Sequence, residues 1–149
     1  MPEGYPYRVV VPTRWNDNDV YGHVNNTVYY AVMDTVINQW LIERAGLDIH
    51  AGDPIALCVE SGCRYLASMD YPDEFDVGVR IARLGRTSVA WEVAIARARD
   101  GLPLAEGRFV HVFVDRATRQ PIPIPPKLRE ALARIQAAPK AAPEDAPEA

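Results

Sequence analysis

The stretch NTVYYAVMDTVINQWLIERA, residues 26–45, decides how the rest of the chain can fold. Its apolar residues recur at every fourth position in two neighbouring rows, which form one broad stripe on a helix. The rows are Val28, Val32, Val36 and Trp40, and Tyr29, Met33, Ile37 and Leu41. Further apolar residues widen the stripe, so we expect one long helix of which little faces water.

The ends of this helix are marked by residues that suit helix termini. Asn25 or Asn26 can cap the start by accepting a hydrogen bond from a free backbone N–H. Gly46 suits the C-terminal end, because glycine readily adopts the left-handed conformation that often closes a helix.

Strands are predicted on both sides of the helix. Apolar residues alternate with polar or small residues over 75–82 and 89–96. A third strand is predicted over 109–114, with Phe109, His111 and Phe113 on one face and Val110, Val112 and Val114 on the other. Short turns at 85–86 and 100–101 separate these segments, which predicts an antiparallel meander. Two more strands are expected at 7–12 and 55–66. The economical arrangement is an α+β fold in which an antiparallel β-sheet wraps around one long central α-helix.

The C-terminal part divides into a short helix and a tail. The segment PPKLREALARIQ, residues 125–136, reads as an amphipathic helix with prolines at its start. Residues 138–149 consist of Ala, Pro, acidic residues and one Lys, and we expect them to be disordered. The predicted organisation is one domain at 1–137 followed by this tail.

Composition excludes several classes of protein. The chain has 149 residues and a net charge of -4, without the basic stripe of a nucleic-acid-binding protein. We find neither a signal peptide nor an apolar run long enough to span a bilayer, so a cytoplasmic location is expected. Cys58 and Cys63 lie five positions apart in one strand, on opposite faces, and are expected to be buried small residues without a disulfide.

The densest polar cluster is RWNDNDVYGHVNNTVYY, residues 14–30. Turn and capping chemistry explains the asparagines, Gly22 and one aspartate. A calcium loop does not fit, because Tyr21 and Val28 fall where oxygen ligands are required. The three histidines are scattered along the chain, so no metal site is predicted. No Gly-x-Ser-x-Gly motif indicates a serine nucleophile.

What remains is a carboxylate just before the N-terminus of a buried helix. The first backbone N–H groups of a helix lack partners and carry partial positive charge, so they can hold a developing oxyanion. A nearby aspartate can act as general base or as nucleophile. Thioesters suit such a site, because a thiolate leaves without much help from an acid.

The cluster resembles the opening motif of the 4-hydroxybenzoyl-CoA thioesterase-like family of hotdog-fold acyl-CoA thioesterases. That pattern reads roughly R-x-x-D-x-D-x-x-G-H-V-N-N-x-x-Y, followed five residues later by an acid. The matching residues here are Arg14, Asp17, Asp19, Gly22, His23, Val24, Asn25, Asn26, Tyr29 and Asp34. The similarity continues through YLASMDYPDEFDV, RLGRTSVAWEV and HVFVDRATRQPIPIPPKLREAL. Many relatives have Glu at the position of Asp34.

The resemblance implies the hotdog fold and hydrolysis of an acyl thioester to the free acid and CoA. It implies catalysis by Asp19, as general base or nucleophile, and an oxyanion contact from the backbone N–H of Asn26. It also implies a homodimer or homotetramer with active sites at the subunit interface. No cofactor is expected, since coenzyme A is part of the substrate.

Further residues are candidates for substrate binding. They are Gly22, His23, Asn25, Tyr29, Arg86, Thr87 and Ser88. Core packing is the leading interpretation for Tyr29, and a structural role for His23 is equally compatible with its position. The alternative function is a hotdog protein that binds an acyl-CoA or an acyl-carrier-protein thioester without hydrolysing it. The sequence does not distinguish CoA from acyl-carrier protein or reveal the acyl group.

Overall fold

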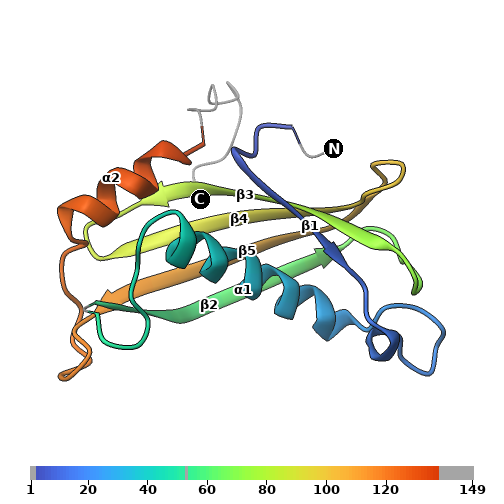
Figure 1. Cartoon of the computed structure of the whole chain (residues 1–149), viewed down its shortest axis with the longest axis horizontal. Coiled ribbons are helices and arrows are strands. Elements are labelled where there is room, and N and C mark those ends of the chain that lie inside the picture. Colours follow the sequence, from blue (N-terminus) through green and yellow to red (C-terminus); the bar gives the residue numbers. More distant parts are fainter. Residues whose placement is uncertain (1–2, 53, 138–149) are drawn as a thin grey trace, which may run out of the picture.

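Five strands form one antiparallel sheet in the order β1-β3-β4-β5-β2, with α1 lying across one face (Figure 1). The computed structural model describes residues 3–52 and 54–137. The elements are β1 (Tyr7–Pro12), the short 3-10 helix η1 (Trp15–Asp17), α1 (Asn26–Glu43), β2 (Ile55–Tyr65), β3 (Glu74–Leu84), β4 (Ser88–Arg97), β5 (Pro103–Val114) and α2 (Pro126–Arg134). The predicted α+β hotdog architecture is confirmed, with α2 as a second, shorter helix.

The predicted meander is the centre of the sheet. β3 pairs with β4 and β4 with β5, both antiparallel, through the two short connections. Gly101 has a φ of 75°, a conformation that glycine adopts without the clash a side chain would bring. β1 and β2, far from each other in sequence, add to opposite edges of the meander.

α1 begins and ends where the sequence indicates. Asn25 is the N-cap: its side chain accepts a hydrogen bond from the backbone N–H of Thr27. Beyond the last turn, Gly46 has a φ of 72° and the N–H of Leu47 bonds to the carbonyl of Leu41. The chain therefore leaves the helix through a left-handed glycine, as expected.

The expectation that little of α1 faces water is wrong for the single chain. The helix is covered by the sheet on one side, while its other side carries exposed residues. They include Ala31, Asp34, Thr35 and Ile42. The physical reason is that one sheet supplies one layer of cover, and nothing in the described part of the chain forms a second layer over this side.

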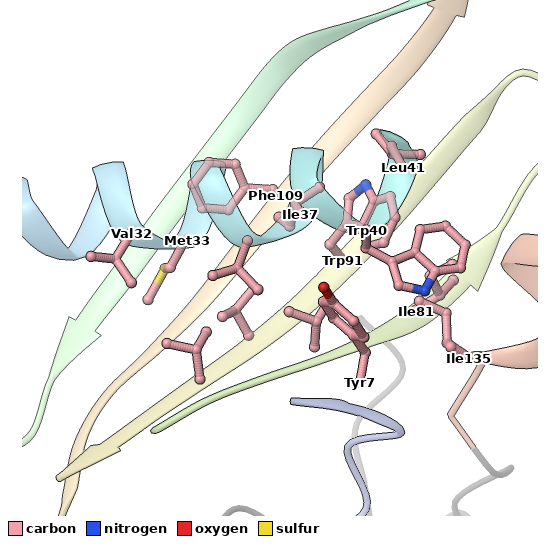
Figure 2. Packing of buried hydrophobic residues seen from close by; sticks show 14 of the residues in the cluster. Tyr7, Val32, Met33, Ile37, Trp40, Leu41, Ile81, Trp91, Phe109 and Ile135 are labelled. Carbon is pink, nitrogen blue, oxygen red and sulfur yellow. The ribbon is translucent and has the colours of Figure 1, made fainter. Parts of the chain in front are cut away.

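The core lies between α1 and the sheet (Figure 2). Met33, Ile37 and Leu41 from α1 are fully buried, as is Trp91 from β4. The rings of Trp40 and Trp91 pack edge to face with centroids 5.7 Å apart. Both helical rows that the sequence defined thus face the sheet.

α2 packs at the end of the sheet where β3 ends (Figure 1). Pro126 is its first residue, and Leu128 and Leu132 are buried. Beyond it, Ile81 of β3 exchanges backbone hydrogen bonds with Ile135 and Ala137, which fixes the end of the described chain. The tail predicted at 138–149 lies outside the described residues.

Both cysteines are free, as predicted, but neither is buried as expected. Cys58 is exposed and Cys63 is half-buried. The reason is that β2 is an edge strand, with a neighbour on one side only. Among the described residues, no helix is long and apolar enough to cross a membrane.

Candidate active site

A tight loop before α1 presents Asp19. The N–H of Asp19 donates to the carbonyl of His23 at 3.0 Å, and the N–H of Gly22 donates to the carbonyl of Asp19 at 3.1 Å. Gly22 has a φ of 89°, so a residue with a side chain would be strained at this turn. The loop is anchored by the bond from the N–H of Val24 to the carbonyl of Met69. Glycine at position 22 therefore has a conformational role in placing Asp19.

The two aspartates of the motif have different environments. Asp17 is buried, and its carboxylate accepts hydrogen bonds from the backbone and side chain of Arg14 at 2.8 and 2.9 Å. The carbonyl of Asp17 also accepts from the N–H of Asn25, which ties η1 to the start of α1. Asp17 is thus occupied in holding the loop together.

Asp19 is half-buried and borders a cavity of about 460 Å³. Its Oδ1 accepts a hydrogen bond from the N–H of Tyr21 at 2.9 Å, which orients the carboxylate. Its Oδ2 has no hydrogen-bond partner within the described residues. One carboxylate oxygen is thus positioned by the loop while the other is available to accept a proton.

The start of α1 borders the same cavity. The Oδ1 of Asn25 accepts from the backbone N–H and the hydroxyl of Thr27 at 2.9 and 2.8 Å, and its carbonyl accepts from the N–H of Val28 at 3.0 Å. No acceptor among the described residues receives the N–H of Asn26. Asn26 lines the cavity together with Asp19. The Asp19 carboxylate and the first residue of α1 therefore border one cavity.

Strand β2 and the segment after it form the opposite wall, which sequence reasoning missed. The lining there is Tyr65, Leu66, Ala67 and Ser68. The ring of Tyr65 packs edge to face on Tyr29, with centroids 5.5 Å apart, and the Tyr65 hydroxyl donates to the carbonyl of Asn26 at 2.9 Å. These residues are 39 positions apart, so no local pattern could have indicated this contact.

The predicted substrate-binding residues divide into two groups. His23 and Tyr29 line the cavity beside Asp19. Tyr29 also contacts Phe75 in the core, at a centroid distance of 5.6 Å. The side chain of Asn25 is engaged in the cap. The structure therefore gives a cavity position to two of these residues and a structural role to Asn25.

Arg86, Thr87 and Ser88 lie elsewhere. Arg86 and Thr87 lie in the β3–β4 turn and Ser88 is the first residue of β4. This turn lies beside α2, at the opposite end of the sheet from the Asp19 loop (Figure 1). The backbone N–H of Ile124 donates to the carbonyl of Arg86 at 3.0 Å, which fixes the turn at that end. Within one chain these residues cannot contact a ligand held beside Asp19 unless that ligand spans the sheet.

Burial changes the proton affinity of the aromatic wall. Burial and the neighbouring Cys63 raise the pKa of Tyr65 to about 12. Burial likewise raises the pKa of Tyr29 and that of the Cys63 thiol. These groups stay protonated near neutral pH, so the Asp19 carboxylate and the His23 imidazole are the candidate bases that line the cavity. Side chains of His, Cys, Asp and Glu form no group of three or more suited to a metal ion in the described part of the chain.

Comparison with known proteins gives the family. The model of the thioesterase-like superfamily matches residues 13–132, which include the Asp19 loop, α1 and the four strands β2 to β5. The chain belongs to the thioesterase-like superfamily. No curated protein gives a significant match to this chain.

Solved structures agree with this assignment. The chain is similar to the PA5185 protein of Pseudomonas aeruginosa, with 48% identity, a TM-score of 0.88 and coverage of 93% of this chain and 96% of that one. A thioesterase from Thermus thermophilus, solved with coenzyme A and zinc, is 30% identical, with a TM-score of 0.73 and coverage of 93% and 100%. A 1,4-dihydroxy-2-naphthoyl-CoA thioesterase from Synechocystis, 19% identical with a TM-score of 0.78 over 85% and 95% of the two chains, shares the fold.

Proposed function

We propose that this protein is an acyl-CoA thioesterase, which hydrolyses an acyl thioester to the free acid and CoA. The observation that carries the proposal is the cavity lined by both Asp19 and Asn26, where the Asn26 N–H at the start of α1 has no acceptor among the described residues. The thioesterase-like family supports this reaction class. The bound coenzyme A of the Thermus thermophilus thioesterase supports the choice of thiol.

In the proposed reaction, Asp19 accepts a proton from water through its unpaired oxygen as the water attacks the thioester carbonyl. The backbone N–H of Asn26 donates to the oxygen that becomes negatively charged in the tetrahedral intermediate. The intermediate collapses with loss of the CoA thiolate, which needs little protonation because a thiol is a comparatively strong acid. Direct attack by the carboxylate, through an anhydride, uses the same two groups.

We further propose that the working unit is a dimer paired through β2. β2 is an edge of the sheet, so the backbone on its free side can pair with a second β2. The side chain of Val59 in this strand is 60% exposed. Ile55 pairs with Val114 and Ser88 with Val112, so the start of β2 and the β3–β4 turn lie at one end of the sheet, opposite Tyr65. Antiparallel pairing of two β2 strands therefore brings the partner's β3–β4 turn toward the Asp19 end.

The function is tested with a panel of acyl-CoA substrates, from short aliphatic to aromatic, and detection of the released thiol. The parent should hydrolyse at least one of them, and Asp19→Asn should lower kcat by about 10²-fold to 10⁴-fold, because the base is lost while the side-chain shape is kept. Asp70→Asn, an exposed carboxylate in the loop before β3, is the matched control and should keep parental kcat.

Two results would overturn the proposal. One is an Asp19→Asn protein that is as active as the parent. The other is a parent that binds acyl-CoA tightly in a calorimeter but releases no thiol, which would assign a binding role instead. Acyl-carrier-protein thioesters belong in the same panel, because activity on these alone would change the substrate from CoA to carrier protein.

A further inference from the structure

Tyr65 contacts the backbone of Asn26, the residue whose N–H is the proposed oxyanion donor. Its hydroxyl donates to the carbonyl oxygen of Asn26 at 2.9 Å. A backbone carbonyl has two lone pairs, so this bond is compatible with a second one within the helix. The end of β2 is thereby fastened to the first turn of α1 beside the cavity.

The peptide group between Asn26 and Thr27 is held at both ends. Tyr65 binds its C=O, and the side chain of Asn25 binds its N–H at 2.9 Å. The peptide group between Val24 and Asn25 is held as well, because its N–H, that of Asn25, donates to the carbonyl of Asp17 at 2.8 Å. The Asn26 N–H thus lies between two restrained peptide groups, which leaves its direction little freedom.

We propose that Tyr65 is a positioning residue for the oxyanion donor. It holds the peptide group between Asn26 and Thr27, which directly follows the one that carries the Asn26 N–H, so that this N–H stays directed into the cavity. This inference rests on the proposed function, and it adds a residue that neither the motif around Asp19 nor the family assignment indicates. Oxyanion stabilisation depends on donors that are fixed before the charge develops, so restraint of the donor contributes to kcat more than to substrate binding.

The tyrosine ring gives the restraint a rigid support. It packs edge to face on Tyr29, which is buried and itself packs on Phe75. The hydroxyl is therefore carried on a ring fixed by the core, although the Tyr65 residue as a whole is 44% exposed. The raised pKa of Tyr65 keeps the hydroxyl in its donor form at working pH.

The test is Tyr65→Phe, which removes the hydroxyl and keeps the ring. Complete loss of an oxyanion donor lowers kcat by about 10²-fold to 10³-fold, so loosening a donor that remains should lower kcat by about 10-fold. KM should change by less than about threefold, because the proton of the hydroxyl is already donated to the Asn26 carbonyl. Tyr71→Phe is the control: no described residue bonds to its hydroxyl, and its kcat should stay parental.

A second measurement is independent of activity. Amide hydrogen exchange by NMR should show faster exchange of the Thr27 N–H in Tyr65→Phe, by about fivefold or more, and no change in Tyr71→Phe. Unchanged exchange at Thr27, or a kcat equal to that of the parent, would overturn the positioning role. If the parent hydrolyses no thioester while exchange at Thr27 still rises in Tyr65→Phe, the proposed function is overturned and the structural restraint is supported.

Discussion

At the scale of single residues, the two aspartates of the motif show how environment separates roles. Asp17 and Asp19 are two positions apart, yet the first is buried against Arg14 and the second lines a cavity with one oxygen unpaired. A carboxylate with every oxygen engaged by the protein stabilises structure, whereas one with a free oxygen beside a helix N-terminus can exchange protons. This difference is the reason that we propose Asp19, and not Asp17, as the reactive residue.

Tyr65 allows a prediction about pH. Folding favours its neutral form, because burial and Cys63 raise its pKa to about 12, above the ordinary value of 10.0. Its hydrogen bond to Asn26 is therefore intact at lower pH and is lost only as the pH approaches 12. We expect the ratio of parental kcat to that of Tyr65→Phe to stay constant from about pH 6 to pH 10.

The measurement is a pair of pH–rate profiles on one acyl-CoA substrate, each recorded at saturating substrate. A ratio that falls with an apparent pKa near 10 would show an unperturbed tyrosine, and would contradict the raised pKa. A ratio that changes near neutral pH would assign the hydroxyl a part in proton transfer instead of positioning.

At the scale of elements, the contact between α1 and β5 depends on a glycine. A Cβ placed on Gly107 would lie 2.2 Å from the Sδ and 2.6 Å from the Cε of Met33, which is fully buried. Met33 has flexible torsions, but the surrounding core leaves it little room to move. The absence of a side chain at position 107 therefore lets α1 pack closely on the sheet.

Gly107→Ala should consequently lower the free energy of unfolding by about 1–3 kcal/mol, as overpacking does in well-packed cores. Met33→Ala alone should also destabilise the protein, because it leaves a cavity. The double variant should be more stable than the sum of the two single effects predicts, since each change relieves the other. Urea denaturation of the four proteins measures this coupling, and strict additivity would contradict the close contact.

The elements differ in how far the sequence could predict them. α1 and the β3-β4-β5 meander were predictable because helical rows and strand alternation are local patterns, and short turns link neighbouring strands. The position of β2 at one edge and β1 at the other depends on contacts between distant segments, which no local pattern encodes. The Tyr65 contact was missed for the same reason, since an aromatic residue near the end of a strand also suits ordinary strand packing.

At the scale of the whole molecule, the single chain leaves several surfaces incomplete. The outer side of α1 carries exposed Ile42, the edge strand β2 carries exposed Val59, and Leu66 beside the cavity is 46% exposed. Arg86, Thr87 and Ser88, predicted to bind substrate, lie at the far end of the sheet from Asp19. The dimer through β2 that we propose would cover the exposed edge strand and bring opposite ends of the two chains together.

Mixed dimers test this arrangement. If one active site combines Asp19 of one chain with Arg86 of the other, then a dimer of one Asp19→Asn chain and one Arg86→Ala chain has one intact site and one doubly defective site. We expect each homodimer to be impaired, and the purified mixed dimer to regain about half of the parental activity per dimer.

The two chains carry different affinity tags, so sequential purification isolates the mixed species, and a mixed dimer of two parental chains is the control. If Arg86 instead served Asp19 of its own chain, each site of the mixed dimer would keep one defect, and activity would stay at the mean of the two homodimers. A chain that sediments as a monomer at working concentration while hydrolysing acyl-CoA would contradict the shared site directly.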